Sequence, residues 1–172
     1  MKASPYQVLF LCTGNSARSI LAESILNHDG EGRFRAFSAG SHPNGQVHPA
    51  AIGLLKKLGH PSASLRSKSW DEFSGPKAPR IDFVFTVCDS AAAEVCPVWP
   101  GQPVSAHWSL PDPAAVDGTQ HQIHLAFAKT YQMLEHRIAL LVDLPLESLD
   151  SVSLQKQLDA IGNAGPSPKN IS

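Results

Sequence analysis

The stretch Val8–Leu26, VLFLCTGNSARSILAESIL, predicts the fold of this chain. It opens with an unbroken apolar run of the kind that is buried on both faces in a parallel sheet. A short loop of small and polar residues follows, and the chain then adopts a helical period, with Leu21 and Ile25 on one face. A buried strand, a tight loop and a helix in this order are typical of an α/β protein with a parallel sheet.

The rest of the chain repeats this alternation. The pattern predicts further strands at 34–38, 81–87 and 104–110 and further helices at 49–58 and 123–141. We therefore expect an α/β fold of three layers, α/β/α, around a central parallel four-stranded sheet. We assign residues 1–145 to a single catalytic domain and residues 146–172 to a C-terminal extension, in which one helix can form before a disordered end.

Composition narrows the class of protein. The chain has 172 residues, enough for one domain with a sizeable core, and a formal net charge of −1. Its basic residues alternate with acidic ones, which argues against binding to nucleic acid, and it has neither a bilayer-length apolar run nor a secretory leader. The odd count of three cysteines favours free thiols over a disulfide scaffold. We expect a cytoplasmic monomer that binds neither nucleic acid nor membranes.

The loop after the first strand has the properties of an anion-binding site. Backbone N–H groups at the positive end of a helix can cradle an oxyanion, and Arg18 adds a planar fork of donors. The positive end of the helix should also stabilise the thiolate of Cys12, which would make this residue a nucleophile beside the anion. The plainer interpretation is a buried strand cysteine and a solvated arginine. The predicted oxyanion-binding residues are Thr13, Gly14, Asn15, Ser16, Ala17, Arg18 and Ser19.

This loop, residues 12–19, resembles the phosphate-binding loop of the low-molecular-weight protein tyrosine phosphatases and of the arsenate reductases that share their fold. The resemblance implies that Cys12 attacks the bound anion and that Arg18 binds it. It further implies that Ser19 hydrogen-bonds the thiolate and that Asn15 shapes the loop.

Two more cysteines follow later in the chain. Cys88 ends the strand predicted at 81–87 as Cys12 ends the first strand, so both sulfurs should open onto the same edge of a parallel sheet. Cys96 comes close behind, on a segment short enough to bring its thiol to Cys88. Taken alone, Cys88 could be an inert core thiol and Cys96 a packed loop residue. The cysteine separations suit no common zinc site, and we predict no bound metal.

The thiols bear on the choice between phosphate and arsenate chemistry, because arsenic(V), unlike phosphorus, can accept two electrons from a pair of thiols. Segments that resemble the thiol-coupled arsenate reductases are Phe37–Pro43, Val87–Asp89, Cys96–Pro97, His107–Trp108 and Leu110–Pro113. The resemblance implies reduction of arsenate, with phosphate or sulfate as mimics, and a disulfide passed from Cys12 to Cys88 and Cys96. No bound cofactor is implied, only an external reductant, either thioredoxin or glutathione with glutaredoxin. The interval from Cys88 to Cys96 is longer than in the familiar thioredoxin-coupled members, which leaves the choice of reductant open.

Asp112 is the remaining catalytic candidate. It follows the strand predicted at 104–110 onto the same edge, and its Asp-Pro pair matches the general acid of the family. A plain Asp-Pro turn is the alternative. The aromatic pair that lines the phosphotyrosine cleft of the phosphatases is replaced here by Ala114 and Ala115, so an aryl ester would have little to pack against.

Two other functions remain open. One is a phosphatase in which the later cysteines are bystanders, and the other is a redox-sensing protein without turnover. A Cys12 thiolate no easier to form than that of a free cysteine would favour the sensor. Glu23 matches a residue that helps to bind potassium in some reductases, but Arg66 and Lys68 fall where such a site needs oxygen ligands, so we predict no potassium site.

Overall fold

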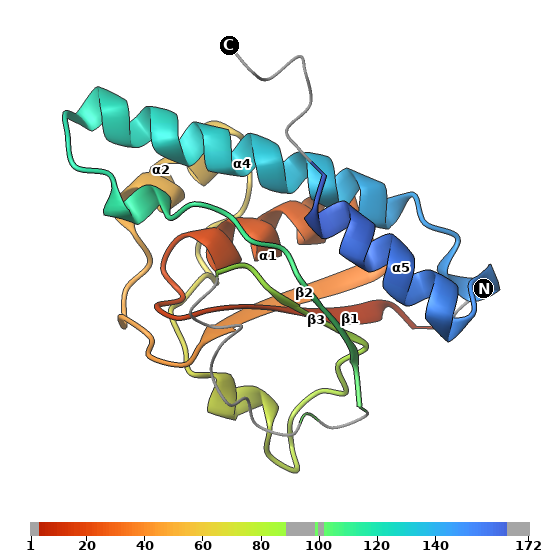
Figure 1. Ribbon diagram of the computed structural model, residues 1–172. Helices are drawn as coiled ribbons and strands as arrows, with labels where there is room; N and C mark the ends of the chain where they lie inside the picture. Colours follow the sequence, from red (N-terminus) through yellow and green to blue (C-terminus); the bar gives the residue numbers. More distant parts are fainter. Residues whose placement is uncertain (1–3, 89–98, 100–101, 165–172) are drawn as a thin grey trace.

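The computed structural model describes residues 4–88, 99 and 102–164. A four-stranded parallel sheet lies at its centre, with strands in the order β2-β1-β3-β4 (Figure 1). The strands are β1 (Tyr6–Cys12), β2 (Phe34–Gly40), β3 (Phe83–Thr86) and β4 (Val104–His107). The prediction of an α/β fold around a parallel four-stranded sheet is confirmed.

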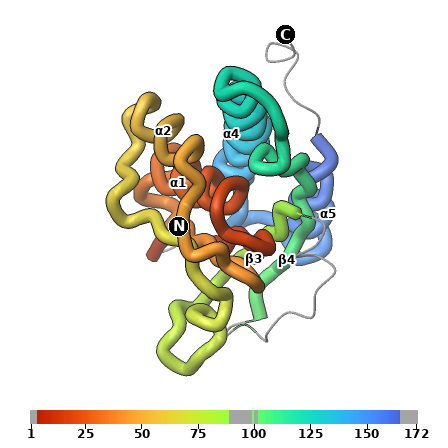
Figure 2. The backbone as a smooth tube through the Cα atoms, turned by 90° about the vertical axis from the view of Figure 1, so that its left-hand side faces the viewer, coloured from red at the N-terminus to blue at the C-terminus, as the bar shows by residue number. Residues whose placement is uncertain are grey.

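Most of the helices cover one face of the sheet. The α-helices are α1 (Arg18–Asp29), α2 (Pro49–Lys57), α4 (Gln120–Val142) and α5 (Ser151–Gly162), and the short 3-10 helices are η1 (Trp70–Phe73), η2 (Pro113–Ala115) and η3 (Leu146–Ser148). Figure 1 shows α1, α2, α4 and α5 on one side of the strands and η1 on the other, and Figure 2 shows the same separation after a quarter turn.

Burial of β1 on both faces explains its unbroken apolar sequence. Phe10 belongs to the cluster that contains the side chains of the four α-helices. Leu9 and Leu11 point to the opposite cluster, where they meet Phe73 of η1. All three β1 side chains are completely buried, so neither face of this strand tolerates a polar residue.

Local signals set the ends of two helices. The ring nitrogen Nδ1 of His48 accepts a hydrogen bond of 3.0 Å from the N–H of Ala50 and so caps α2, which begins at Pro49. Thr119 and Gln122 form a reciprocal capping box at the start of α4. Both caps satisfy helix N–H groups that have no acceptor within their own helix.

Helix α5 covers the outer strand of the sheet. Gln155 donates a hydrogen bond of 2.9 Å from its side-chain amide to the carbonyl of Ser105 in β4. The indole N–H of Trp108, which is completely buried, donates to the carbonyl of Leu158 at 3.1 Å. Residues 165–172, for which we expected disorder, lie outside the described part of the chain. No helix within the described part is both long and apolar enough to span a bilayer.

Candidate active site

The loop between β1 and α1 has a fixed shape because of Asn15. This residue adopts the left-handed conformation, with φ of 45°, and its side chain is completely buried. Asparagine is one of the few residues that enter this conformation at low cost, because its short polar side chain can hydrogen-bond locally. Asn15 therefore turns the chain sharply from the end of β1 toward α1.

Three backbone carbonyls of the loop accept hydrogen bonds from residues outside it. The N–H groups of His42, Asn44 and His48 donate, each at 2.9 Å, to the carbonyls of Thr13, Gly14 and Ser16 respectively. Because a trans peptide is planar, its N–H points away from its carbonyl. The N–H groups of Gly14, Asn15 and Ala17 are therefore turned toward the inside of the loop, which is the arrangement that binds an oxyanion.

Cys12 lies at the bottom of this loop and is 3 % exposed. Its sulfur lies 2.9 Å from the hydroxyl oxygen of Ser19 and accepts a hydrogen bond of 3.2 Å from the N–H of Asn15. Burial raises the pKa of the Cys12 thiol, and these hydrogen bonds oppose the rise without cancelling it. The sequence predicted a stabilised thiolate. That prediction is wrong in direction, because it counted the donors of the loop and not the burial of the sulfur, which disfavours the charged form.

The side chain of Asn15 connects Ser19 to a distant part of the chain. Its amide nitrogen donates to the hydroxyl oxygen of Ser19 at 2.8 Å, and its amide oxygen accepts the backbone N–H of Lys68, also at 2.8 Å. The Lys68 ammonium lies 3.6 Å from the carboxylate of Glu23. Lys68 is one of the two basic residues because of which the sequence analysis expected no potassium site at Glu23.

Arg18 and Asp112 come together at the edge of the site. One guanidinium nitrogen of Arg18 donates to the carbonyl of Leu110 at 3.0 Å, and another lies 3.5 Å from Oδ2 of Asp112. The other carboxylate oxygen of Asp112 accepts the N–H of Ala114 at 2.9 Å, which caps η2. This cap leaves Oδ2 as the oxygen directed toward Arg18.

Cys88 also reaches the loop. Its sulfur is buried and lies 3.6 Å from the hydroxyl oxygen of Thr13. A negative charge on Cys88 acts to raise the pKa of Cys12 further, as expected for neighbouring sulfurs. Cys96, the third predicted thiol, lies outside the described residues.

Two contacts that support the loop had no signal in the sequence. A Cβ atom on Gly40 would lie 2.4 Å from the carbonyl oxygen of Thr13, so only glycine allows β2 to approach the loop this closely. Ser67 donates from its hydroxyl to the carbonyl of Gly14 at 3.2 Å. Both depend on how segments distant in sequence pack together.

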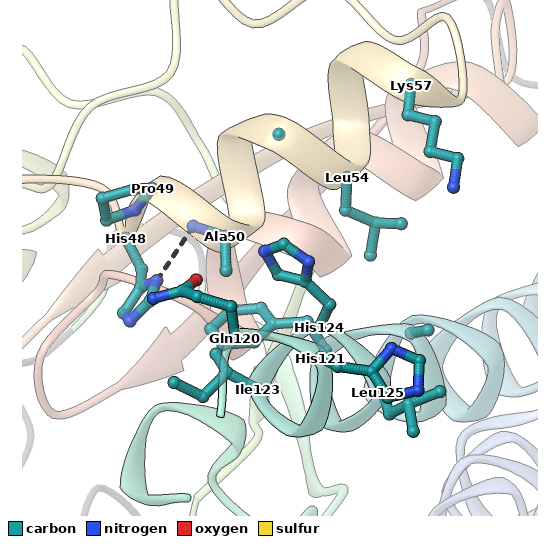
Figure 3. A pocket seen from close by; sticks show the side chains of 13 residues that line it. His48, Pro49, Ala50, Leu54, Lys57, Gln120, His121, Ile123, His124 and Leu125 are labelled. Atoms are coloured by element: carbon teal, nitrogen blue, oxygen red, sulfur yellow. Dashed lines mark hydrogen bonds between the residues drawn. The ribbon is translucent and has the colours of Figure 1, made fainter. Parts of the chain in front are cut away.

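A cavity of about 770 Å³ lies between α2 and α4, beside the loop (Figure 3). Side chains of both helices line it, among them Leu54 of α2 and His124 of α4. His48, which lines the cavity, donates its backbone N–H to the carbonyl of Ser16 in the loop, and none of the predicted site residues within the described part of the chain is among the lining residues. Within residues 4–88, 99 and 102–164, no three His, Cys, Asp or Glu side chains are placed to hold a metal ion.

Similar proteins share both the sequence pattern and the fold. A curated protein named arsenate reductase, from Halalkalibacterium halodurans, is 34 % identical over 131 residues, which are 76 % of this chain and 91 % of that protein. The solved structure of an arsenate reductase in the phosphate binding state is 25 % identical, with a TM-score of 0.60 and coverage of 78 % of this chain and 97 % of that one.

A thioredoxin-dependent arsenate reductase from Corynebacterium glutamicum is 25 % identical, with a TM-score of 0.54, and the match covers 82 % of this chain and 65 % of that one. The family model described as low molecular weight phosphotyrosine protein phosphatase matches residues 7–158, which include the loop, the sheet except its first residue, and most of α5. On this evidence the chain belongs to the low molecular weight phosphotyrosine protein phosphatase family.

Proposed function

We propose that this protein is an arsenate reductase in which Cys12 attacks bound arsenate and Cys88 completes the reduction. The observation that carries the proposal is the position of the Cys88 sulfur, 3.6 Å from the hydroxyl of Thr13, the residue after Cys12. A hydrolase needs only the nucleophile, the anion-binding loop and a general acid. A second buried thiol at the same loop supplies what reduction of arsenic(V) requires, a partner for a disulfide.

The first step forms a bond between Cys12 and arsenic. Arsenate binds to the inward N–H groups of the loop and to the guanidinium of Arg18. As the Cys12 sulfur attacks, its proton passes to an arsenate oxygen, which a dianion accepts readily. The arsenate hydroxyl leaves as water after taking a proton from Asp112. The products are a Cys12 thioarsenate, water and an Asp112 carboxylate.

The second step reduces arsenic. Cys88 attacks the sulfur of Cys12, so that an S–S bond forms and the S–As bond breaks. The electron pair of the broken bond goes to arsenic, which leaves as arsenite with the proton of Cys88 and a further proton from solvent. Two thiols are oxidised to one disulfide while arsenic(V) becomes arsenic(III). Cys96 then attacks Cys88, which frees Cys12 for another turn.

An external dithiol must reduce the disulfide after each turn. The Corynebacterium glutamicum relative is described as thioredoxin-dependent, which supports thioredoxin over glutathione with glutaredoxin for this chain. A disulfide between Cys12 and Cys88 would be poorly accessible to such a partner, because each residue is only 3 % exposed, and this supports a role for Cys96 in passing the disulfide on. In this scheme no resident cofactor or metal takes part.

The test is arsenite production with each reductant supplied separately. Thioredoxin with its reductase, and glutathione with glutaredoxin, are given to wild-type protein and to the Cys12→Ser, Cys88→Ser and Cys96→Ser variants. We expect turnover with thioredoxin in the wild type and none in any variant. Full turnover in the Cys88→Ser variant would refute the disulfide route, whatever the reductant.

A phosphatase is the rival within the same family, since the loop would also accept a phosphate ester. Against it, Ala114 and Ala115 of η2 are exposed at the place where the resemblance expects aromatic side chains. Weak hydrolysis of small aryl phosphates would fit both functions. Arsenite release that requires thioredoxin fits only the reductase.

The raised pKa of Cys12 is the one observation that favours a redox sensor without turnover. A thiol that stays protonated reacts slowly by itself. In a sensor, bound arsenate would not be expected to speed the reaction of Cys12. Rapid modification of Cys12 by arsenate but not by sulfate, followed by several turnovers per protein molecule, would exclude the sensor. A single oxidation without further turnover would support it.

A further inference from the structure

An ion pair is buried behind the loop, away from the anion. Lys68 is 8 % exposed, and its ammonium lies 3.6 Å from the carboxylate of Glu23. The same carboxylate oxygen accepts a hydrogen bond of 2.5 Å from the hydroxyl of Ser38, and the ammonium donates to the carbonyl of Arg66 at 3.0 Å. Burial raises the pKa of Glu23 and lowers that of Lys68, so the burial of both charges is costly.

Such a pair is poor evidence for stability, because desolvation of two charges can exceed their attraction. Apolar residues of similar size would often be as stable. A buried ion pair can instead fix one arrangement of the chain, since each charge accepts few alternative partners. The question is therefore which arrangement Lys68 fixes.

The backbone of Lys68 is held on both sides. Its N–H donates to the amide oxygen of Asn15 at 2.8 Å, and its carbonyl accepts the N–H of Gly40 in β2 at 2.9 Å. The side-chain ion pair with Glu23 of α1 ties the same residue to the helix that begins at Arg18. Lys68 thus joins α1, β2 and the loop at one point.

The hydrogen bond from Lys68 also sets the direction of the contacts that lead to Cys12. A backbone N–H can only donate, so the side-chain oxygen of Asn15 must face it, and the amide nitrogen must face Ser19. The hydroxyl oxygen of Ser19 then accepts from Asn15 at 2.8 Å, which leaves its hydrogen free to point at the sulfur 2.9 Å away. Each donor in this series of hydrogen bonds is fixed by the donor before it.

We infer that Lys68 is a positioning residue, whose ion pair with Glu23 holds the backbone donor that orients Asn15 and directs the Ser19 hydroxyl to Cys12. The inference rests on the proposed role of Cys12 as the nucleophile. The charges of Lys68 and Glu23 do not touch the sulfur of Cys12, but they then control how easily its thiolate forms, because a donated hydrogen bond favours the ionised sulfur.

The test measures Cys12 alone, without arsenate. The rate of alkylation by iodoacetamide is followed against pH in a Cys88→Ser, Cys96→Ser background, which removes the other two thiols. Arg18 and Asp112 are then the charged side chains that remain at the site. Lys68→Met removes the ammonium at similar volume and keeps the backbone N–H. We expect alkylation at pH 7 to fall about tenfold, because one pKa unit is a factor of ten in thiolate population. Lys56→Met, at an exposed position of α2, is the matched control and should leave the pH profile unchanged.

A second variant separates positioning from the cost of an unpaired charge. Lys68→Met combined with Glu23→Gln leaves no buried charge and is expected to fold even if the single variant does not. We expect its alkylation to remain about tenfold slower than that of the Cys88→Ser, Cys96→Ser background alone, because the ion pair between Lys68 and Glu23 is gone. A wild-type profile in the double variant, or in a folded single variant, would overturn the inference. Neither outcome depends on reduction of arsenate, so failure of the proposed function would be seen separately.

Discussion

The hydroxyl of Thr13 lies 3.6 Å from the sulfur of Cys88, although the two residues are 75 positions apart in sequence. The register of the sheet explains this proximity. Leu11 of β1 pairs with Thr86 of β3, and Thr13 and Cys88 each follow two residues after that pair, where the two segments still run side by side. Both strands end at the same edge, which is where parallel sheets bind their ligands. The second thiol therefore reaches the loop without any special bend of the chain.

The Cys88→Ser variant should stop after the first chemical step. We expect it to form the adduct between Cys12 and arsenic but to release no arsenite, because serine cannot form the S–S bond that expels arsenic. The measurement is intact-protein mass spectrometry after mixing with arsenate, together with arsenite release. Cys12→Ser is the control and should give neither adduct nor arsenite. Release of arsenite by Cys88→Ser at the wild-type rate would contradict the disulfide scheme.

The sequence predicted the elements of the sheet well, because periodicity is a local property. The apolar run that begins at Val8 and residues 34–38 lie in strands as predicted, and the helix that begins at Arg18 ends before Gly30. The strands predicted at 81–87 and 104–110 are shorter in the structure, at Phe83–Thr86 and Val104–His107. The apolar residues Ile81, Val87 and Trp108 lie just outside the strands but are completely buried, so burial alone did not mark where the strands end.

The candidate site was predicted less completely. The contact of Cys12 with Ser19 could be expected from the family resemblance, and the approach of Cys88 from the order of strands. The support from Gly40 and Lys68 could not, since it depends on packing between segments that no local pattern connects. The direction of the Cys12 pKa also required the fold, because it depends on how deeply the sulfur is buried.

Arg18→Lys should weaken oxyanion binding. Lysine keeps the charge but loses the planar fork that can bind two oxygens at once. The loss of one charge-assisted hydrogen bond, worth about 1.5–3 kcal/mol, corresponds to roughly a tenfold to hundredfold loss of affinity. Phosphate affinity, measured by protection of Cys12 from alkylation, checks this directly. Arg35→Lys, on an exposed position of β2, is the control and should bind phosphate as the wild type does.

Ser19→Ala should make the Cys12 thiolate still harder to form. The hydroxyl of Ser19 opposes the rise in pKa that burial causes, so its removal leaves burial less opposed. Alkylation in the Cys88→Ser, Cys96→Ser background should therefore require a higher pH than in that background alone. Ser151→Ala, at an exposed position at the start of α5, should have no effect. An unchanged pH profile for Ser19→Ala would mean that the hydroxyl does not donate to the sulfur.

The raised pKa of Cys12 also predicts how stability depends on pH. A thiol whose pKa is higher in the folded state contributes stability that is fully present below its ordinary pKa of 9.0 and is lost as the pH rises through the folded value. The free energy of unfolding of the wild type should therefore fall relative to that of Cys12→Ser above about pH 9. Denaturant unfolding of both proteins between pH 7 and the alkaline range measures the difference. A constant difference would show that the pKa of Cys12 is not raised by folding.

Gly40→Ala should disturb the loop from behind. The added Cβ would lie 2.4 Å from the carbonyl oxygen of Thr13 and 3.0 Å from the Cβ of Asn15, so either β2 or the loop must move. Overpacking of this kind costs about 1–3 kcal/mol of stability. The matched control is Gly53→Ala in α2, where a Cβ meets nothing within 4 Å and alanine should stabilise the helix by about 0.5–1 kcal/mol. Guanidinium unfolding measures both changes. Because the loop carries the inward N–H groups, phosphate affinity should fall in Gly40→Ala and stay unchanged in Gly53→Ala, and equal behaviour of the two variants would mean that the close approach of β2 does not shape the site.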